Sequence, residues 1–135
     1  MLGSMAVRVG TDVIEIGRIE RALERPGFRD RCFTPAEQAY CETRRRPAES
    51  YAARFCGKEA VGKALGCGVL FTWKEIEIVG PPKPGVTLAG KTLRWAERAG
   101  MREIDVSLTH SHTVAAATCV AELDAPPIRR PRPSS

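Results

Sequence analysis

The sequence contains no Cys-x-x-Cys pair. It has five cysteines, and because this number is odd they cannot all pair in disulfides within the chain. These absences argue against a disulfide-stapled secreted domain and against the common cysteine-based metal sites. We therefore expect free thiols in a reducing cytoplasm. The cysteines are Cys32, Cys41, Cys56, Cys67 and Cys119.

Long apolar runs are also missing. No stretch reaches the roughly 18 apolar residues that a membrane-spanning helix needs, and the first residues lack the pattern of a signal peptide. We expect a cytoplasmic protein with no membrane partner. The chain has 135 residues, of which 43% are hydrophobic and 27% charged, and this composition is typical of one globular domain.

Acidic residues are absent from the C-terminal tail, residues 125–135, which holds three arginines of a chain with net charge +5. Without these three charges the body carries only +2, which gives little support to a polyanionic partner such as nucleic acid. The tail is Pro-rich and predicted to be disordered. We interpret residues 1–4 as a cloning remnant before a native Met5, which leaves one domain over residues 5–124.

Hydrophobic periodicity predicts a mixture of helices and strands. In residues 103–109 apolar and polar side chains alternate, which is typical of a half-buried strand. Residues 113–122 fit a strand or a helix, and we favour a strand because a tight turn at 110–112 would pair it with its predecessor. The other predicted strands are 7–13, 75–79 and 86–88, and the predicted helices are 15–25, 34–44, 49–65 and 91–99. Helices early and strands late predict an α+β fold with an antiparallel sheet.

Two helices carry clear boundary signals. Thr34 and Glu37 form a capping box, with Pro35 at the first helical position. Gly66 directly follows the helix predicted over 49–65, where glycine suits the C-cap.

The predicted helix 15–25 has two different faces. The apolar face consists of Ile16, Ile19 and Leu23. The opposite face carries three arginines at the same spacing, Arg18, Arg21 and Arg25. Glutamates flank these arginines, so a solvated face is the simpler interpretation.

Three residues could carry chemistry. Asp12 ends the first predicted strand, where a turn role and a role in a site are about equally expected. Glu59 and Lys63 lie four residues apart on one helix face. On an arbitrary helix, a surface ion pair between them is the simpler interpretation.

Two features of the same helix count against that simple interpretation. Phe55 shares the face of Glu59, so the carboxylate lies beside an apolar side chain. Gly57 and Gly62 interrupt the helix interior, at a cost of about 1 kcal/mol each relative to alanine. Such glycines make sense if another element or a ligand approaches closely.

Residues 10–13, Gly-Thr-Asp-Val, resemble the first motif of the 4′-phosphopantetheinyl transferase superfamily. Residues 54–63, with Lys-Glu-Ala and a lysine four residues after the glutamate, resemble the second motif. Residues 33–37, 64–68 and 106–111 are similar to its short, single-module branch. The similarity extends over residues 7–123, and two ordered motifs with three flanking segments are far more specific than a lone motif.

The resemblance implies a fold with a long central helix and a Mg²⁺-dependent transfer. The 4′-phosphopantetheine arm of coenzyme A would pass to a serine of an apo acyl carrier protein, with release of adenosine 3′,5′-bisphosphate. The motifs assign the Mg²⁺ carboxylates to Asp12 and Glu59, and they assign Lys63 to cancelling pyrophosphate charge. The serine proton would go to Glu59 or to a metal-bound water, and the sequence does not choose between them.

The resemblance also implies a coenzyme site, and it requires no further organic cofactor. The residues expected to bind coenzyme A are Arg54, Lys58, Lys63, Gly66, His110 and Ser111. Without the resemblance, a lone histidine after a strand is more often a turn or core residue. We interpret His112 as structural, and Trp73 and Trp95 as core residues.

Two partners follow from the resemblance. An acidic carrier protein is expected to dock on the face of Arg18, Arg21 and Arg25, and a homotrimer is expected to bind coenzyme A between neighbouring subunits. The carrier could serve fatty-acid or polyketide synthesis, and the sequence does not distinguish them.

Two alternatives stay open. A nucleic-acid-binding module would use the basic face on phosphates, but aromatic residues do not alternate with basic ones. A catalytically silent homologue would not need an intact Asp12, Glu59 and Lys63.

Overall fold

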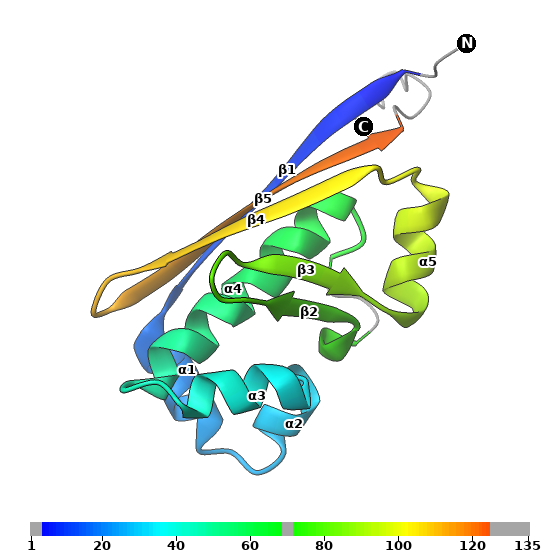
Figure 1. The fold of residues 1–135 in the computed structure, drawn as a ribbon. Helices are drawn as coiled ribbons and strands as arrows, with labels where there is room; N and C mark the ends of the chain where they lie inside the picture. Colours follow the sequence, from blue (N-terminus) through cyan, green and yellow to red (C-terminus); the bar gives the residue numbers. More distant parts are fainter. Residues whose placement is uncertain (1–3, 69–71, 125–135) are drawn as a thin grey trace, which may run out of the picture.

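The computed structural model describes residues 4–68 and 72–124, and it confirms the α+β fold with a long central helix (Figure 1). In chain order the elements are β1 (Met5–Glu15), α1 (Ile16–Leu23), α2 (Phe28–Cys32), α3 (Pro35–Glu42), α4 (Pro47–Leu65), the 3₁₀ turn η1 (Trp73–Glu75), β2 (Ile76–Val79), β3 (Gly85–Leu88), α5 (Gly90–Arg98), β4 (Glu103–His110) and β5 (Val114–Asp124). Within these residues no helix is long and apolar enough to cross a membrane. The predicted tail 125–135 and residues 1–3 of the predicted remnant lie outside the described residues.

The main sheet has the strand order β1-β5-β4, with both pairs antiparallel. The turn between β4 and β5 closes with a hydrogen bond of 2.8 Å from the Ser111 amide to the Val114 carbonyl. This hairpin confirms the strand interpretation of residues 113–122. β2 and β3 form a separate two-stranded antiparallel sheet, so the chain builds two antiparallel sheets where the sequence predicted one.

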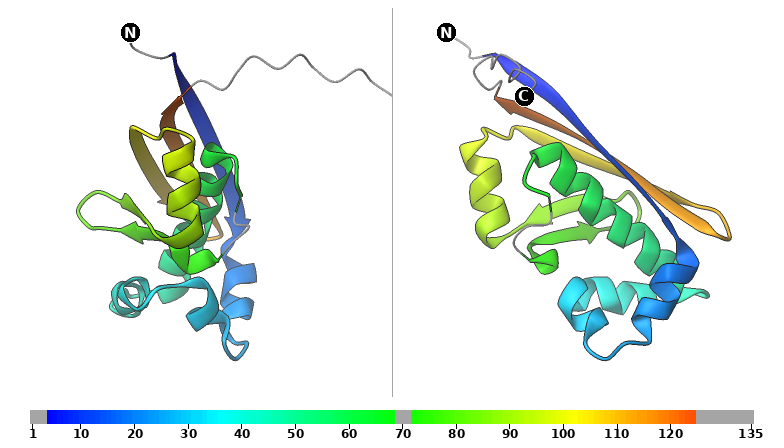
Figure 2. Two further views of the ribbon diagram at one scale, coloured as in Figure 1. Left: turned by 90° about the vertical axis from the view of Figure 1, so that its right-hand side faces the viewer. Right: turned by 180° about the vertical axis from the view of Figure 1, so that it is seen from behind.

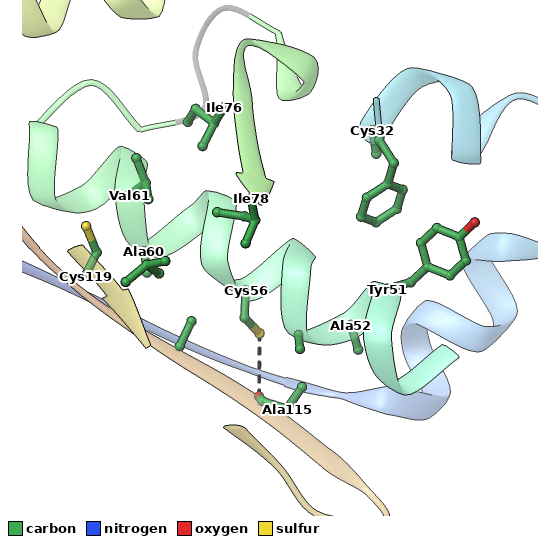
Figure 3. Packing of buried hydrophobic residues seen from close by; sticks show 14 of the residues in the cluster. Cys32, Tyr51, Ala52, Cys56, Ala60, Val61, Ile76, Ile78, Ala115 and Cys119 are labelled. Carbon is green, nitrogen blue, oxygen red and sulfur yellow. Dashed lines mark hydrogen bonds between the residues drawn. The ribbon is translucent and has the colours of Figure 1, made fainter. Parts of the chain in front are cut away.

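α4 packs on one face of the main sheet, and the other helices lie on the same side (Figures 1 and 2). β5 turns small buried side chains toward α4 at alternate positions, including Ala115, Ala117 and Cys119. Figure 3 shows the resulting contact, in which Cys56 Sγ donates to the Ala115 carbonyl over 3.5 Å. Small residues on the sheet therefore let the helix axis come close to the strands.

The closest approach of β1 to α4 is at Gly10. A Cβ atom at this position would lie 1.9 Å from the Ala60 carbonyl oxygen, so only glycine fits. Asp12 is two residues further along β1 and therefore faces the same side of the sheet. The right panel of Figure 2 shows β1 running alongside α4, and Asp12 of β1 lies 3.6 Å from Lys63 of this helix.

Both glycines inside α4 are explained by neighbouring elements. A Cβ at Gly57 would lie 3.0 Å from Leu108 Cδ2 of β4 and 3.2 Å from Ile78 of β2. A Cβ at Gly62 would lie 2.6 Å from the Gly68 backbone. Of the two possibilities that the sequence left open, the structure supports the close approach of another element.

The helix boundaries follow the capping signals. The capping box is present, since the Thr34 amide donates to Glu37 Oε1 over 2.9 Å and the Glu37 amide donates to Thr34 Oγ1 over 3.2 Å. Gly66 ends α4 with φ 82°. α1 ends at Leu23, so Arg25 lies beyond the helix predicted to hold it. α2 was not predicted, because five residues are too few for a periodic signal.

All five cysteines are free and buried, as expected. Burial raises the pKa of Cys41, Cys56 and Cys119 to about 12. These thiols therefore stay protonated at neutral pH and act as small core residues.

Candidate active site

The three predicted catalytic residues meet where β1 packs against α4. Lys63 Nζ lies 3.6 Å from Asp12 Oδ1 and donates to the Thr11 carbonyl over 2.9 Å. The lysine therefore pairs with Asp12 across two elements, whereas the sequence suggested Glu59 on its own helix as the simple partner. We call Asp12, Glu59 and Lys63 the carboxylate cluster.

The two carboxylates of this cluster influence each other. Burial raises the pKa of Glu59, the negative charge of Asp12 raises it further, and Lys63 opposes both effects. Two carboxylates in one site repel each other, and a cation placed between them relieves that repulsion. A further cation bound at the cluster would therefore reduce the repulsion that Lys63 alone leaves between the two carboxylates.

The donor set fits a magnesium ion. In the described part of the chain, no group of three or more His, Cys, Asp or Glu side chains could hold a metal ion. Two carboxylates are nevertheless what Mg²⁺ usually takes from a protein, because phosphate oxygens and water complete its shell. The neighbouring Cys56 offers no thiolate, since burial and the charge of Asp12 raise its pKa to about 12.

A second group of predicted residues lines a pocket of about 180 Å³. Arg54 is only 6% exposed, its Nη2 donates to the Gly80 carbonyl over 3.2 Å, and its Cζ lies 4.0 Å from the centroid of the Tyr40 ring. His110 and Pro82 also line this pocket. We call this feature, defined by Tyr40, Arg54, Gly80 and His110, the arginine pocket.

His110 faces two acceptors through one ring nitrogen. Its Nδ1 lies 3.2 Å from the Ser111 carbonyl and 3.5 Å from Glu49 Oε2, and both are acceptors. We therefore assign a proton to Nδ1. The Ser111 hydroxyl accepts from the Thr113 and Val114 amides over 3.3 and 3.2 Å, so it also closes the turn.

The carboxylate cluster and the arginine pocket lie apart within one chain. Arg54 and Glu59 are five residues apart on α4, which corresponds to about 140° around a helix. Asp12 lies on β1 and His110 on β4, the two outer strands of the sheet, with β5 between them. None of the carboxylate-cluster residues lines the arginine pocket. One chain therefore does not gather all the predicted site residues into one cleft.

The structure corrects the expectation that Lys58 lines the coenzyme site. Lys58 has no exposed surface, and its Nζ lies 2.7 Å from Glu37 Oε1. The same ammonium donates to the Trp73 and Ile76 carbonyls over 3.0 and 2.5 Å. Burial lowers the pKa of Lys58, and the Glu37 carboxylate opposes that shift. All three donors are used inside the fold, so none is left for a ligand.

The remaining predicted residues are placed as follows. Arg18, Arg21 and Arg25 are exposed, and Gly66 is exposed at the end of α4 beyond Lys63. The tryptophans pack against the core, as expected, with Trp73 stacked on Phe55 at 4.4 Å and Trp95 donating to the Leu65 carbonyl over 2.8 Å.

Sequence reasoning missed Tyr40 and Glu49. Both reach the arginine pocket or its histidine through contacts between α3, α4 and β4. No local spacing in the sequence indicates such contacts. The one available signal was Tyr40, which stands four residues before the first of three consecutive arginines.

Comparison with known proteins agrees with this geometry. Residues 8–119 match the family model of the 4′-phosphopantetheinyl transferase superfamily. The chain is 47% identical over 120 residues to a holo-[acyl-carrier-protein] synthase of Moorella thermoacetica, covering 86% of this chain and 94% of that protein. A synthase of the same name from Chlamydia felis is 43% identical over 118 residues, covering 84% and 94%.

Solved structures show the same fold. The complex of the Chronobacterium ammoniagenes synthase with coenzyme A is similar with a TM-score of 0.79 and 27% identity, over 89% of this chain and 99% of that one. The Helicobacter pylori synthase in complex with coenzyme A has a TM-score of 0.73 and 28% identity, over 84% and 98%. The chain therefore belongs to the 4′-phosphopantetheinyl transferase superfamily, in its holo-[acyl-carrier-protein] synthase branch.

Proposed function

We propose that this chain transfers the 4′-phosphopantetheine arm of coenzyme A to a serine of an apo acyl carrier protein. The observation that carries the proposal is the carboxylate cluster, because both family motifs fold into contact through Asp12 and Lys63. The family assignment favours this reaction over nucleic-acid binding. The intact cluster favours an active enzyme over a silent homologue.

The reaction is a phosphoryl transfer. The serine Oγ of the carrier forms a bond to the phosphorus that bears the pantetheine arm, and the bond from that phosphorus to the bridging oxygen breaks. The leaving group is adenosine 3′,5′-bisphosphate. Negative charge grows on this leaving group, and the exposed Lys63 ammonium is positioned to stabilise it. The carboxylate of Glu59, with its raised pKa, is the group of this chain best suited to accept the serine proton.

Asp12 and Glu59 would hold a magnesium ion in this site. When bound, the ion supplies charge neutralisation on the pyrophosphate. The protein itself contributes the close packing of β1 on α4 at Gly10, two residues before Asp12.

The proposed function is tested by following both nucleotides. We expect coenzyme A to be consumed, and adenosine 3′,5′-bisphosphate to appear in equal amount, only when Mg²⁺ and an apo carrier protein are present. Liquid chromatography of the quenched reaction measures both. Consumption of coenzyme A without the carrier, or no consumption with several apo carriers, would contradict the proposal.

Arg18, Arg21 and Arg25 form the proposed carrier-docking surface. All three are exposed, and none of them pairs with a carboxylate in residues 4–68 and 72–124. α1 follows directly after β1, so these arginines lie 6, 9 and 13 residues beyond Asp12 in the sequence. An acidic carrier bound there would have its serine near the carboxylate cluster.

Reversing two of these charges, Arg18→Glu with Arg21→Glu, should raise the apparent KM for the carrier roughly five- to twentyfold at low salt. The KM for coenzyme A should stay nearly unchanged, and the effect should shrink as salt rises. The matched control is Arg94→Glu with Arg98→Glu, because these exposed arginines lie on α5 and change the net charge equally. If both double variants raised the KM for the carrier equally, the change would reflect net charge, and the docking surface on α1 would be refuted.

We propose a homotrimer whose active sites lie between subunits. The separation of the carboxylate cluster from the arginine pocket supports sharing, since a second chain could bring its pocket to the cluster. The outer face of the main sheet supports assembly. No element within residues 4–68 and 72–124 covers it, and Val7, Val9, Val13 and Val120 are 59, 59, 65 and 41% exposed on it. A face of this kind is typical of a protein interface.

Subunit exchange tests the shared site. Neither Glu59→Ala nor His110→Ala protein should be active alone, but refolding an equal mixture should restore up to about a quarter of wild-type activity. This fraction follows because each interface that forms at random in an equal mixture has one chance in four of joining an intact Glu59 to an intact His110. The assembly state is measured by light scattering on a sizing column. A monomer at assay concentration, or background activity after confirmed exchange, would contradict the shared site.

A cytoplasmic location is proposed with the same function. Five buried free cysteines suit a reducing compartment. The proposed function fits a carrier protein of fatty-acid synthesis and one of polyketide synthesis equally well. Comparing kcat/KM for the two carriers would assign the pathway.

A further inference from the structure

Arg54 is a buried cation without a counter-charge. The residue is only 6% exposed. No carboxylate lies within 4 Å of its guanidinium in the described part of the chain. Its Nε is buried and has no hydrogen-bond partner there. The neighbouring Cys41 does not compensate the charge, because burial raises the pKa of this thiol to about 12.

Burying a charge without a partner is costly, so something else must favour this arrangement. The Lys58 ammonium, one turn further along α4, shows the contrast, since it is buried with the Glu37 carboxylate at 2.7 Å. Arg54 instead has one carbonyl, that of Gly80 at 3.2 Å, and the face of one aromatic ring. The pocket that Arg54 lines therefore carries a positive charge that an anion could balance.

Tyr40 is the main neutral contact of this guanidinium. The Arg54 Cζ lies 4.0 Å from the ring centroid, and the Cζ of the exposed Arg44 lies 5.6 Å from the same centroid. Tyr40 also lines the arginine pocket beside Arg54 and His110. An aromatic face attracts a cation without neutralising it, so the guanidinium keeps its full charge for a ligand.

We infer that Tyr40 is a positioning residue for coenzyme binding, which holds the Arg54 guanidinium correctly directed toward a phosphate group of coenzyme A. The inference rests on the proposed function, because it takes coenzyme A as the anion. It goes beyond that function in giving the α3 tyrosine a role through its ring face. The hydroxyl group of Tyr40 is not needed for this role.

The test is a double-mutant cycle on the affinity for coenzyme A. Tyr40→Leu should raise the Kd measured by calorimetry about five- to twentyfold, whereas Tyr40→Phe should stay within about twofold, because it keeps the ring. In an Arg54→Gln background, Tyr40→Leu should have almost no further effect. The KM for the carrier should not change in any of these variants. Phe28→Leu is the matched control, since this buried aromatic residue contacts Phe33 and Phe55 but no guanidinium.

A second series protects the test against misfolding. Replacing Tyr40 by phenylalanines that carry one, two and three ring fluorines keeps the shape of the side chain but weakens the negative face of the ring. The Kd for coenzyme A should rise stepwise with fluorination in wild type and should stay level in Arg54→Gln.

The outcomes separate the inference from the proposed function. If Arg54→Gln weakens coenzyme binding but Tyr40→Leu and the fluorinated rings do not, the proposed function stands and the inference is overturned. Equal losses from Tyr40→Leu with and without Arg54 also overturn it, because Tyr40 would then act independently. If the wild-type protein binds no coenzyme A, the proposed function fails first and the inference fails with it.

Discussion

Asp12→Asn and Glu59→Gln should each lower kcat/KM at least about 100-fold, which corresponds to about 3 kcal/mol of transition-state stabilisation. Each change removes one negative charge from the carboxylate cluster while keeping the size of the side chain. The cluster would then lose part of the negative charge that is proposed to hold a magnesium ion beside Lys63. Steady-state transfer measured with saturating carrier and varied Mg²⁺ gives the loss directly.

The control for this prediction is Glu97→Gln, an exposed carboxylate on α5, which should keep wild-type activity. Excess chelator should silence the wild-type enzyme, and added Mg²⁺ should restore it. Near-normal turnover by either cluster variant, or full activity in chelator, would refute the assignment of these two carboxylates to a metal.

Lys58→Met should lower the free energy of unfolding by about 3–5 kcal/mol. The change leaves the Glu37 carboxylate buried without its cation and leaves the Trp73 and Ile76 carbonyls without their donor. Adding Glu37→Gln should recover part of the loss, because it removes the uncompensated charge. Urea unfolding followed by circular dichroism measures each variant.

Lys63→Met is the matched control for stability. This lysine is on the same helix, but its side chain is 52% exposed, and exposed ion pairs contribute about 0–1 kcal/mol. We therefore expect Lys63→Met to lose activity with little loss of stability and Lys58→Met to lose stability first. A stability loss for Lys58→Met no larger than that of Lys63→Met would show that the buried pair is not needed by the fold.

The sequence predicts the elements well where the signal is local. The capping box at Thr34 and Glu37, the glycine after α4 and the alternation in β4 each depend on neighbours within a few residues. Their physical causes are hydrogen bonds at a helix end or burial of one strand face, and both are visible in a short window. α2 escaped because a single turn has no period to detect.

In the candidate site too, the sequence identified what the motifs contain and missed what depends on tertiary packing. Asp12, Glu59 and Lys63 lie in two motifs whose resemblance to a family is specific, and the structure brings Asp12 and Lys63 into contact. Lys58 lies in the same motif, but its burial is decided by Glu37, which is 21 residues away in sequence and comes from another helix. The motif alone could not separate a lysine that faces the core from one that faces solvent.

Tyr40 shows the same limit for an aromatic side chain. Its contact with Arg54 depends on how α3 packs against α4, the two helices that the buried Glu37–Lys58 ion pair also joins. Such a contact follows from tertiary structure, so no pattern in the sequence predicts it.

The most direct test of the central claim is the intact mass of an apo acyl carrier protein after incubation with this chain, coenzyme A and Mg²⁺. We predict that the carrier gains the mass of one phosphopantetheine group. A carrier whose acceptor serine is replaced by alanine should gain nothing, and neither should a reaction with the Glu59→Gln protein. An unchanged mass of the wild-type carrier, with folded enzyme and intact coenzyme A present, would contradict the assignment of this chain as a phosphopantetheinyl transferase.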